Sequence, residues 1–113
     1  ISRGAQIHDS GALQSAAYLG MLANVKFLLG KGARINEIPK YSPGDERDFS
    51  NGTALHRAVD GSHVEVVRYL LESGADTLIR DQRGRTAMDI AKEQGREHME
   101  EIIDLLNKTK TKL

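Results

Sequence analysis

Hydrophobic positions recur along this chain in short helical patterns separated by glycine-containing turns. The clearest pattern covers residues 64–72, where four apolar residues spaced three, three and one positions apart share one helical face: Val64, Val67, Leu70 and Leu71. Ser73 and Gly74 follow and predict the end of the helix, because glycine adopts the left-handed backbone that commonly closes one. The chain is therefore predicted to consist of short amphipathic helices.

Three pairs of such helices are predicted. They cover residues 12–19 and 22–29, 54–60 and 64–72, and 87–93 and 97–107. Thr53 is expected to cap the third helix, since its hydroxyl can accept a hydrogen bond from the first turn. Residues 76–83 are expected to be extended. Alanines recur where the helices of a pair must approach each other, and they predict close packing there: Ala16, Ala17, Ala58 and Ala91.

Two stretches of the chain match when they are aligned 33 residues apart, so that Leu55 falls on Met88 and Ala58 on Ala91. A third copy places Leu13 42 residues before Leu55, which is the same period of 33 plus an insertion of nine. Self-similarity at a fixed period is the signature of a repeat array. Such an array is a stack, and a stack usually offers a binding surface rather than a reaction centre.

Composition narrows the function further. The chain has 113 residues, of which 39% are hydrophobic and 28% charged, as expected for one globular domain. Its 16 basic and 16 acidic side chains leave no net charge, which argues against a nucleic-acid or membrane-surface binder. No apolar run approaches the length of a membrane span. The absence of cysteine excludes disulfides and thiolate-bound metals.

Catalytic or metal-binding chemistry has little support in the sequence. His56, Asp60 and His63 would suit zinc if they converged, but the break at residues 61–62 separates His63 from the other two. No phosphate-binding loop, dinucleotide fingerprint or nucleophile elbow occurs. We therefore expect no enzyme activity, no cofactor and no metal.

Several motifs carry a family resemblance. They are Thr53-Ala54-Leu55-His56, Thr86-Ala87-Met88-Asp89, residues 66–71, Gly74-Ala75-Asp76 and, in the first copy, Leu28-Leu29 and Gly32-Ala33. At these residues the chain resembles the ankyrin-repeat family. The resemblance implies an all-α solenoid of about three helix-turn-helix repeats with projecting hairpin-like fingers. Gln14 and Asp89 depart from it, because they stand where the family has the histidine found at His56.

The resemblance also divides the chain. It assigns 1–10 to the tail of a preceding repeat, 11–37 to repeat one, 38–47 to an inserted loop and 48–80 to repeat two. Residues 81–107 are expected to form a C-terminal capping repeat with a polar outer face, and residues 108–113 a fraying tail. An apolar stretch around residues 18–22 is expected either to pack against missing upstream repeats or to serve as a functional or dimer contact.

The insertion between repeats one and two is the individual feature of this chain. It contains both prolines, Pro39 and Pro43, and the resemblance implies that it lengthens one finger or bulges from it. Two of the five aromatic residues, Tyr41 and Phe49, lie in or beside it. Aromatic side chains often anchor interfaces. A tolerated loop without a role and a binding loop both remain open.

The function implied by the resemblance is protein–protein recognition by an intracellular module, cytoplasmic or nuclear, with no nucleic-acid or membrane partner. The expected surface combines finger tips and first helices: Tyr18, Leu19, Tyr41, Phe49, Ser50, Asp60, Gln82, Arg83, Arg85 and Glu93. Tyr18, Tyr41 and Phe49 are expected to be apolar anchors, and Arg83 and Arg85 to pair with carboxylates. The alternative is a structural or regulatory spacer that packs against another domain of the same protein. Self-association through the N-terminal edge is a further possibility.

Overall fold

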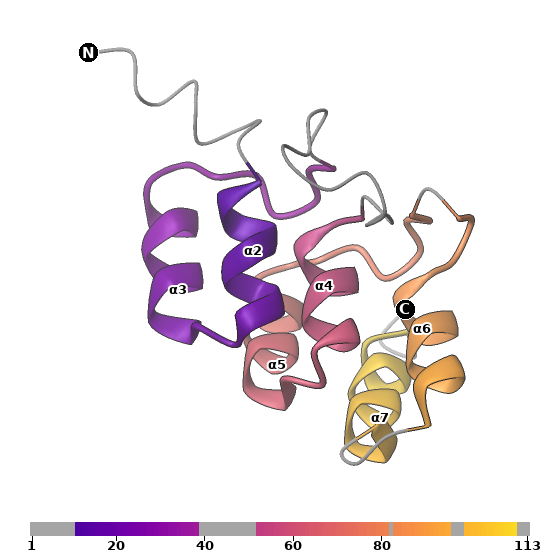
Figure 1. Cartoon of the computed structure of the whole chain (residues 1–113). Helices are drawn as coiled ribbons and strands as arrows, with labels where there is room; N and C mark the ends of the chain where they lie inside the picture. Colours follow the sequence, from indigo (N-terminus) through magenta and orange to yellow (C-terminus); the bar gives the residue numbers. More distant parts are fainter. Residues whose placement is uncertain (1–10, 39–51, 82, 96–98, 111–113) are drawn as a thin grey trace.

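The computed structural model describes residues 11–38, 52–81, 83–95 and 99–110 (Figure 1). These residues form helices and turns, and no strand occurs within the described ranges. The helices are α2 (Ala12–Leu19), α3 (Leu22–Gly30), α4 (Ala54–Asp60), α5 (Val64–Glu72), α6 (Ala87–Gln94) and α7 (Met99–Lys110). The all-α solenoid predicted from the sequence is confirmed.

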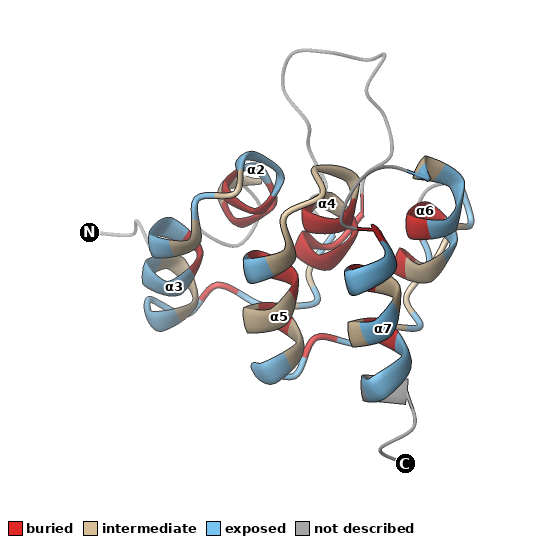
Figure 2. Cartoon of the chain, turned by 90° about the horizontal axis from the view of Figure 1, so that it is seen from below, coloured by how far each residue is buried: buried red, intermediate tan, exposed pale blue. Residues whose placement is uncertain are grey.

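The helices form two layers, as Figures 1 and 2 show. The inner layer consists of α2, α4 and α6, side by side, and the outer layer of α3, α5 and α7. Extensive contacts join the two helices of each repeat and most equivalent helices of neighbouring repeats, above all α2 and α4, whereas α3 touches α5 only slightly. The central pair, α4 and α5, is therefore covered by a repeat on either side.

The core lies between the layers and between successive repeats, where Figure 2 shows the buried residues in red. Ala17, Ala58 and Ala91, on α2, α4 and α6, are at most 1% exposed. This confirms the prediction of close packing at the recurring alanines, since a larger side chain would separate the helices. Leucine, valine and isoleucine fill the remaining space, with Leu55, Leu70, Val67 and Ile102 fully buried.

Capping interactions explain where two inner helices begin. The Thr53 hydroxyl accepts a hydrogen bond from the backbone N–H of His56, and the His56 ring accepts one from the N–H of Thr53. Thr86 and Asp89 form the same reciprocal pair at the start of α6. Each pair satisfies two backbone donors that a helix start leaves without partners. The prediction that Thr53 caps α4 is confirmed.

The structure corrects the sequence predictions at several boundaries. α3 ends at Gly30 and α6 at Gln94, one residue later than predicted, and α7 continues to Lys110 because no glycine or proline interrupts it. Residues 77–78 form a turn rather than extended chain, since the Asp76 carboxylate accepts a hydrogen bond from the N–H of Leu78 at 2.9 Å. The inserted loop falls mostly outside the described residues.

Candidate partner-binding surface

The inner helices place one residue of each repeat at the same position. Tyr18 precedes Asp60 by 42 residues and Asp60 precedes Glu93 by 33, so the three occupy equivalent sites near the ends of α2, α4 and α6. All three were predicted to bind a partner. Each of them contacts a side chain from a neighbouring element, and we call these residues and their contacts the inner-helix surface.

Tyr18 contributes an aromatic ring to this surface. It is 40% exposed, and the guanidinium of Arg57 on α4 lies 4.7 Å from the ring centroid. The Tyr18 carbonyl accepts a hydrogen bond from Nε2 of His63 at 2.8 Å. Contacts from repeat two therefore hold both the ring and the backbone of Tyr18, while part of the ring stays accessible.

Asp60, on repeat two, is held by a contact from repeat three. Its carboxylate accepts a hydrogen bond of 2.6 Å from the side-chain amide of Gln94 on α6. This contact crosses the junction between repeats two and three. It fixes the carboxylate at the junction.

Arg85 organises the end of the surface that lies beside α6. Its guanidinium contacts the Asp81 carboxylate at 3.1 Å and the Glu93 carboxylate at 2.9 Å. Asp81 is buried, which acts to raise its pKa, but hydrogen bonds from the N–H groups of Arg85 and Arg83, together with the Arg85 charge, hold that pKa below its usual value. The sequence predicted that Arg85 pairs with a carboxylate, and in the structure both carboxylates come from its own chain.

His56 joins repeats two and three beneath this surface. Its Nδ1 accepts a hydrogen bond from the N–H of Thr53 at 3.0 Å, so the proton lies on Nε2 and is donated to the Arg85 carbonyl at 2.9 Å. Burial lowers the pKa of His56, since a charged ring would lose solvation and would carry a second proton toward the Thr53 N–H. The role of His56 in the structure is to connect repeats.

Two of the remaining predicted residues, Arg83 and Leu19, are described by the structure, and they lie apart. Arg83 is exposed close to Arg85. Leu19 is 62% exposed and lines a groove on repeat one. Leu19 is thus not brought together with the inner-helix surface. Four predicted residues lie outside the described residues: Tyr41, Phe49, Ser50 and Gln82.

Two residues of the surface, Arg57 and Gln94, were not predicted. Gln94 follows Asp60 by 34 residues, one more than the repeat period, so the period itself brings them together once the repeats stack. Arg57 follows Tyr18 by 39 residues, three fewer than the 42-residue step from repeat one to repeat two. The repeat spacing is the signal that could have identified both pairs.

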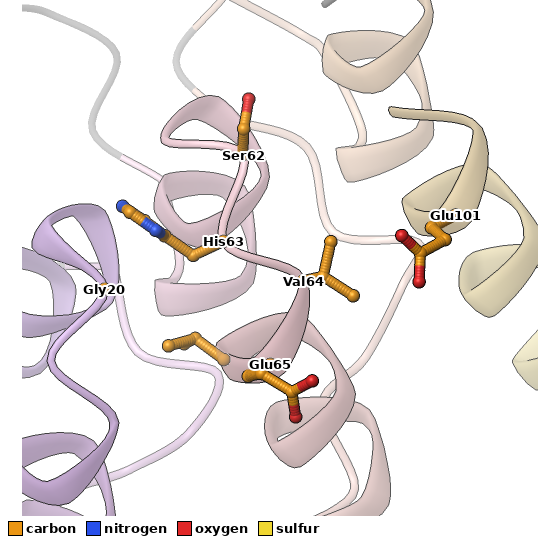
Figure 3. Close-up of a pocket in the computed structure, with 7 residues that line it drawn as sticks. Gly20, Ser62, His63, Val64, Glu65 and Glu101 are labelled. Carbon is orange, nitrogen blue, oxygen red and sulfur yellow. The ribbon is translucent and has the colours of Figure 1, made fainter. Parts of the chain in front are cut away.

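A second hollow lies where α2, α5 and α7 approach, with a volume of about 400 Å³ (Figure 3). It is lined by His63, Glu65 and Glu101 among others, but Figure 3 shows the His63 ring directed toward Gly20 and away from Glu101. Among the residues that the structure describes, no group of three or more metal-binding side chains occurs. The sequence had likewise predicted that His63 is separated from His56 and Asp60 by the helix break at residues 61–62.

A family model described as ankyrin repeats, in three copies, matches residues 13–112. The chain belongs to the ankyrin-repeat family. The resemblance seen in the sequence is thereby confirmed. Ankyrin repeats are generally protein–protein interaction modules, and the coarse functional class of this chain follows from that membership.

Similar proteins differ widely in kind. The chain is 34% identical over 81% of its length to the potassium channel AKT1 of Arabidopsis thaliana, and 41% identical over 60% to the putative ankyrin repeat protein L271 of Acanthamoeba polyphaga mimivirus. It is 35% identical over 74% to the mouse ankyrin repeat and SAM domain-containing protein 6. The chain spans only 11%, 8% and 9% of these proteins, respectively.

None of the helices described here is both long and apolar enough to cross a membrane.

Proposed function

We propose that this chain binds a partner protein through its inner-helix surface. The observation that carries the proposal is the row formed by Tyr18, Asp60 and Glu93, in which each residue is held by a contact from a neighbouring element. Side chains that are fixed before binding lose less conformational entropy when a partner arrives. An aromatic ring and two oriented carboxylates therefore suit specific recognition.

The residues of this surface have separate roles. Tyr18 acts as an apolar anchor, and the predicted anchors Tyr41 and Phe49 extend it if the insertion reaches the same face. Arg83 pairs with a carboxylate of the partner. Arg85 is a positioning residue, because its guanidinium holds Glu93 in place.

Substitutions on the two layers test the proposal. Tyr18→Ala and Glu93→Gln should each weaken the affinity for a partner captured from cell extract by about tenfold or more, the effect expected when an interface anchor is removed. Glu72→Gln, at an exposed position on α5 of the outer layer, is the matched control. Dissociation constants are measured with the purified partner, and circular dichroism confirms that each variant is folded. If all three variants bind as tightly as the original chain, the surface is not the binding site.

A second candidate function is a spacer that packs against another domain of the same protein. The exposed apolar residues Leu19, Met21 and Phe27 favour it, since large apolar side chains gathered on one surface usually mark a contact. Removing this contact would leave partner binding at the inner-helix surface intact.

We further propose that the chain works inside the cell, in the cytoplasm or nucleus, with proteins rather than nucleic acids or membranes as partners. The balanced charge supports the choice of partner, because a nucleic-acid binder normally carries a basic excess. Fractionation of cells that express the tagged chain tests the location, and appearance in the medium would contradict it.

A further inference from the structure

The turn before α6 brings three arginines close in sequence to the threonine that caps this helix. Arg80, Arg83 and Arg85 precede Thr86 by six, three and one positions. Asp81 is the one acidic residue of the sequence between Arg80 and Thr86, and its carboxylate is buried 3.1 Å from the Arg85 guanidinium. Arg80 and Arg83 are exposed. The segment that leads into Thr86 therefore presents positive charge to solvent.

Thr86 differs in accessibility from the equivalent threonine of repeat two. Thr53 is 1% exposed, and its capping partner His56 reaches repeat three through a hydrogen bond of 2.9 Å. Thr86 is partly exposed, and its capping partner Asp89 lies at the surface. Three positions before Thr53 the chain has Ser50 instead of an arginine. Of these two capping threonines, Thr86 therefore combines access with a preceding arginine, and Thr53 has neither.

The backbone around Thr86 suits an enzyme that binds extended chain. Residues 79–81 and 83–86 lie outside helices, and Thr86 itself is extended, with φ of −84° and ψ of 171°. Its hydroxyl accepts a hydrogen bond from the N–H of Asp89 at 3.2 Å, at the long end of the usual range. The preceding turn is closed by a hydrogen bond of 2.9 Å from the Gly84 N–H to the Asp81 carbonyl. An enzyme can therefore engage the segment by opening this turn and the first turn of α6.

We propose that Thr86 is phosphorylated by an arginine-directed protein kinase, which pairs its own carboxylates with arginines ahead of the acceptor. Arg83, three positions before Thr86, is the residue that we assign to this pairing. In the reaction the Thr86 hydroxyl oxygen attacks the γ-phosphorus of ATP, the bond from this phosphorus to the β–γ bridging oxygen breaks, and ADP leaves. The hydroxyl proton passes to a base of the kinase. The modification does not depend on partner binding at the inner-helix surface, so either proposal can fail without the other.

The phosphate enters a site that already holds charges of both signs. The N–H of Thr86 donates a hydrogen bond to the Asp89 carboxylate at 3.0 Å. This bond, together with the charges of Arg80 and Lys92, holds the pKa of Asp89 below its usual value. Because a phosphate carries a charge of about −2 at pH 7, it repels the Asp89 carboxylate and attracts Arg80 and Lys92. Phosphorylation therefore replaces Asp89 by the phosphate at the start of α6.

Incubation of the folded chain with ATP, Mg²⁺ and the catalytic domain of an arginine-directed kinase tests the proposal. Mass spectrometry of proteolytic peptides should locate phosphate at Thr86 and not at Thr53. Arg83→Gln should slow phosphorylation of Thr86 by about tenfold or more, since it removes a charge-assisted contact with the kinase. Arg68→Gln, at a partly exposed position on α5 of the outer layer, is the matched control and should leave the rate unchanged. Thr86→Asn keeps a residue that caps helices but lacks the hydroxyl, and it should take up no phosphate in this segment.

A synthetic peptide of residues 78–91 separates recognition from access. If the kinase modifies the peptide but not the folded chain, the fold closes the site and the proposal is wrong. If it modifies neither, the arginines do not direct it to this threonine, and the proposal is equally wrong. Phosphate found only at Ser50, which follows Arg47 by three positions, would also overturn it.

The exchange at the start of α6 has its own measurement. Phosphorylation should shift the urea midpoint less favourably in the original chain than in the Asp89→Asn variant, because only the original chain has a carboxylate beside the phosphate. Equal shifts in the two proteins would show that the phosphate does not displace Asp89 and would overturn this part of the inference.

Discussion

At the scale of single residues, Ser62 stands out because it has a positive φ of 62° without being glycine. The equivalent residues of repeats one and three, Gly20 and Gly95, have φ of 74° and 58°. A side chain in this left-handed region costs energy that glycine avoids. The Ser62 hydroxyl oxygen is also buried without a hydrogen-bond partner.

Ser62→Gly should therefore stabilise the chain by about 0.5–1 kcal/mol, as relief of the backbone strain outweighs the entropy that glycine adds to the unfolded state. The free energy of unfolding is measured in urea. Ser62→Ala is the control, because it removes the hydroxyl and keeps the strained φ. An equal gain in the alanine variant would assign the effect to the buried oxygen instead of the backbone.

His56 predicts a pH dependence of stability. The pKa of His56 is below the ordinary 6.5 in the folded chain, so well above pH 6.5 the ring is neutral in both the folded and the unfolded state. As the pH falls below 6.5, the unfolded chain binds a proton that the folded chain does not, and stability decreases until the folded pKa is reached. The loss is at most about 1.4 kcal/mol per pH unit. Asp81, with its lowered pKa, remains ionised in this window.

His56→Asn is the matched variant, since its amide oxygen can accept the hydrogen bond from Thr53 but does not titrate. It should be less stable at pH 7 by about 1 kcal/mol, because the Arg85 carbonyl loses one donor, and it should lack the decrease between pH 6.5 and 5. Urea unfolding across this pH range provides the test. The same slope in both proteins would show that another group is responsible.

At the scale of elements, the junction between α2 and the α4–α5 turn depends on the absence of a side chain at Gly61. A Cβ there would lie 2.5 Å from the Tyr18 carbonyl oxygen and 2.7 Å from Cδ2 of His63. Gly30, at the end of α3, has no atom within 4 Å of an added Cβ and no positive φ. A side chain is therefore excluded at Gly61 and tolerated at Gly30.

Gly61→Ala should destabilise the chain by about 1–3 kcal/mol, since the overlap involves a backbone oxygen that cannot easily move. Gly30→Ala should stabilise it by up to about 1 kcal/mol, because alanine restricts the unfolded chain more than glycine does. Thermal and urea unfolding of the two variants are compared with the original chain. A neutral Gly61→Ala variant would show that the repeats can shift apart at this junction.

The elements themselves were largely predictable from the sequence. The bounds of α2, α4 and α5 agree with the prediction, because apolar periodicity and the flanking glycines or Thr53 coincide there. The end of α7 was not predicted, since its last turns have no apolar pattern to mark them. The turn at residues 77–78 depends on the Asp76 side chain, which periodicity does not detect.

The candidate site was predicted only in part. Tyr18, Asp60 and Glu93 were predicted from the resemblance to the ankyrin-repeat family, and the repeat period shows that the three occupy equivalent positions. The contacts that hold them were not predicted. The repeat spacing carries a signal for Arg57 and Gln94, but the geometry of these contacts and that of Arg85 depends on how neighbouring elements pack. The same dependence explains why Leu19, adjacent to Tyr18, belongs to a different surface.

At the scale of the whole molecule, the extensive helix contacts connect each repeat with its neighbours along the stack. Stability in such a chain is approximately the sum of repeat and interface contributions. α4 is packed on both sides, by α2 and α6, and five of its residues are buried. Local unfolding of the central repeat, and of α4 in particular, should therefore be the least frequent in the molecule.

Hydrogen exchange measures this order. The amides of α4 should exchange most slowly. Those of α3, where Val25 is the only buried residue, should exchange at least about tenfold faster than those of α4. Exchange is followed by NMR or mass spectrometry at pH 7. Equal protection of α3 and α4 would show that the chain unfolds as one cooperative unit.

The stacking of repeats in sequence order also decides how the molecule would respond to force. A load applied between the two ends of the stack runs through each repeat interface in turn, because neighbouring repeats form the extensive contacts. The outer repeats have fewer interfaces than the central one and would detach first. The chain should therefore lengthen in discrete steps of one repeat each, and the repeats at the two ends should unfold before the central one.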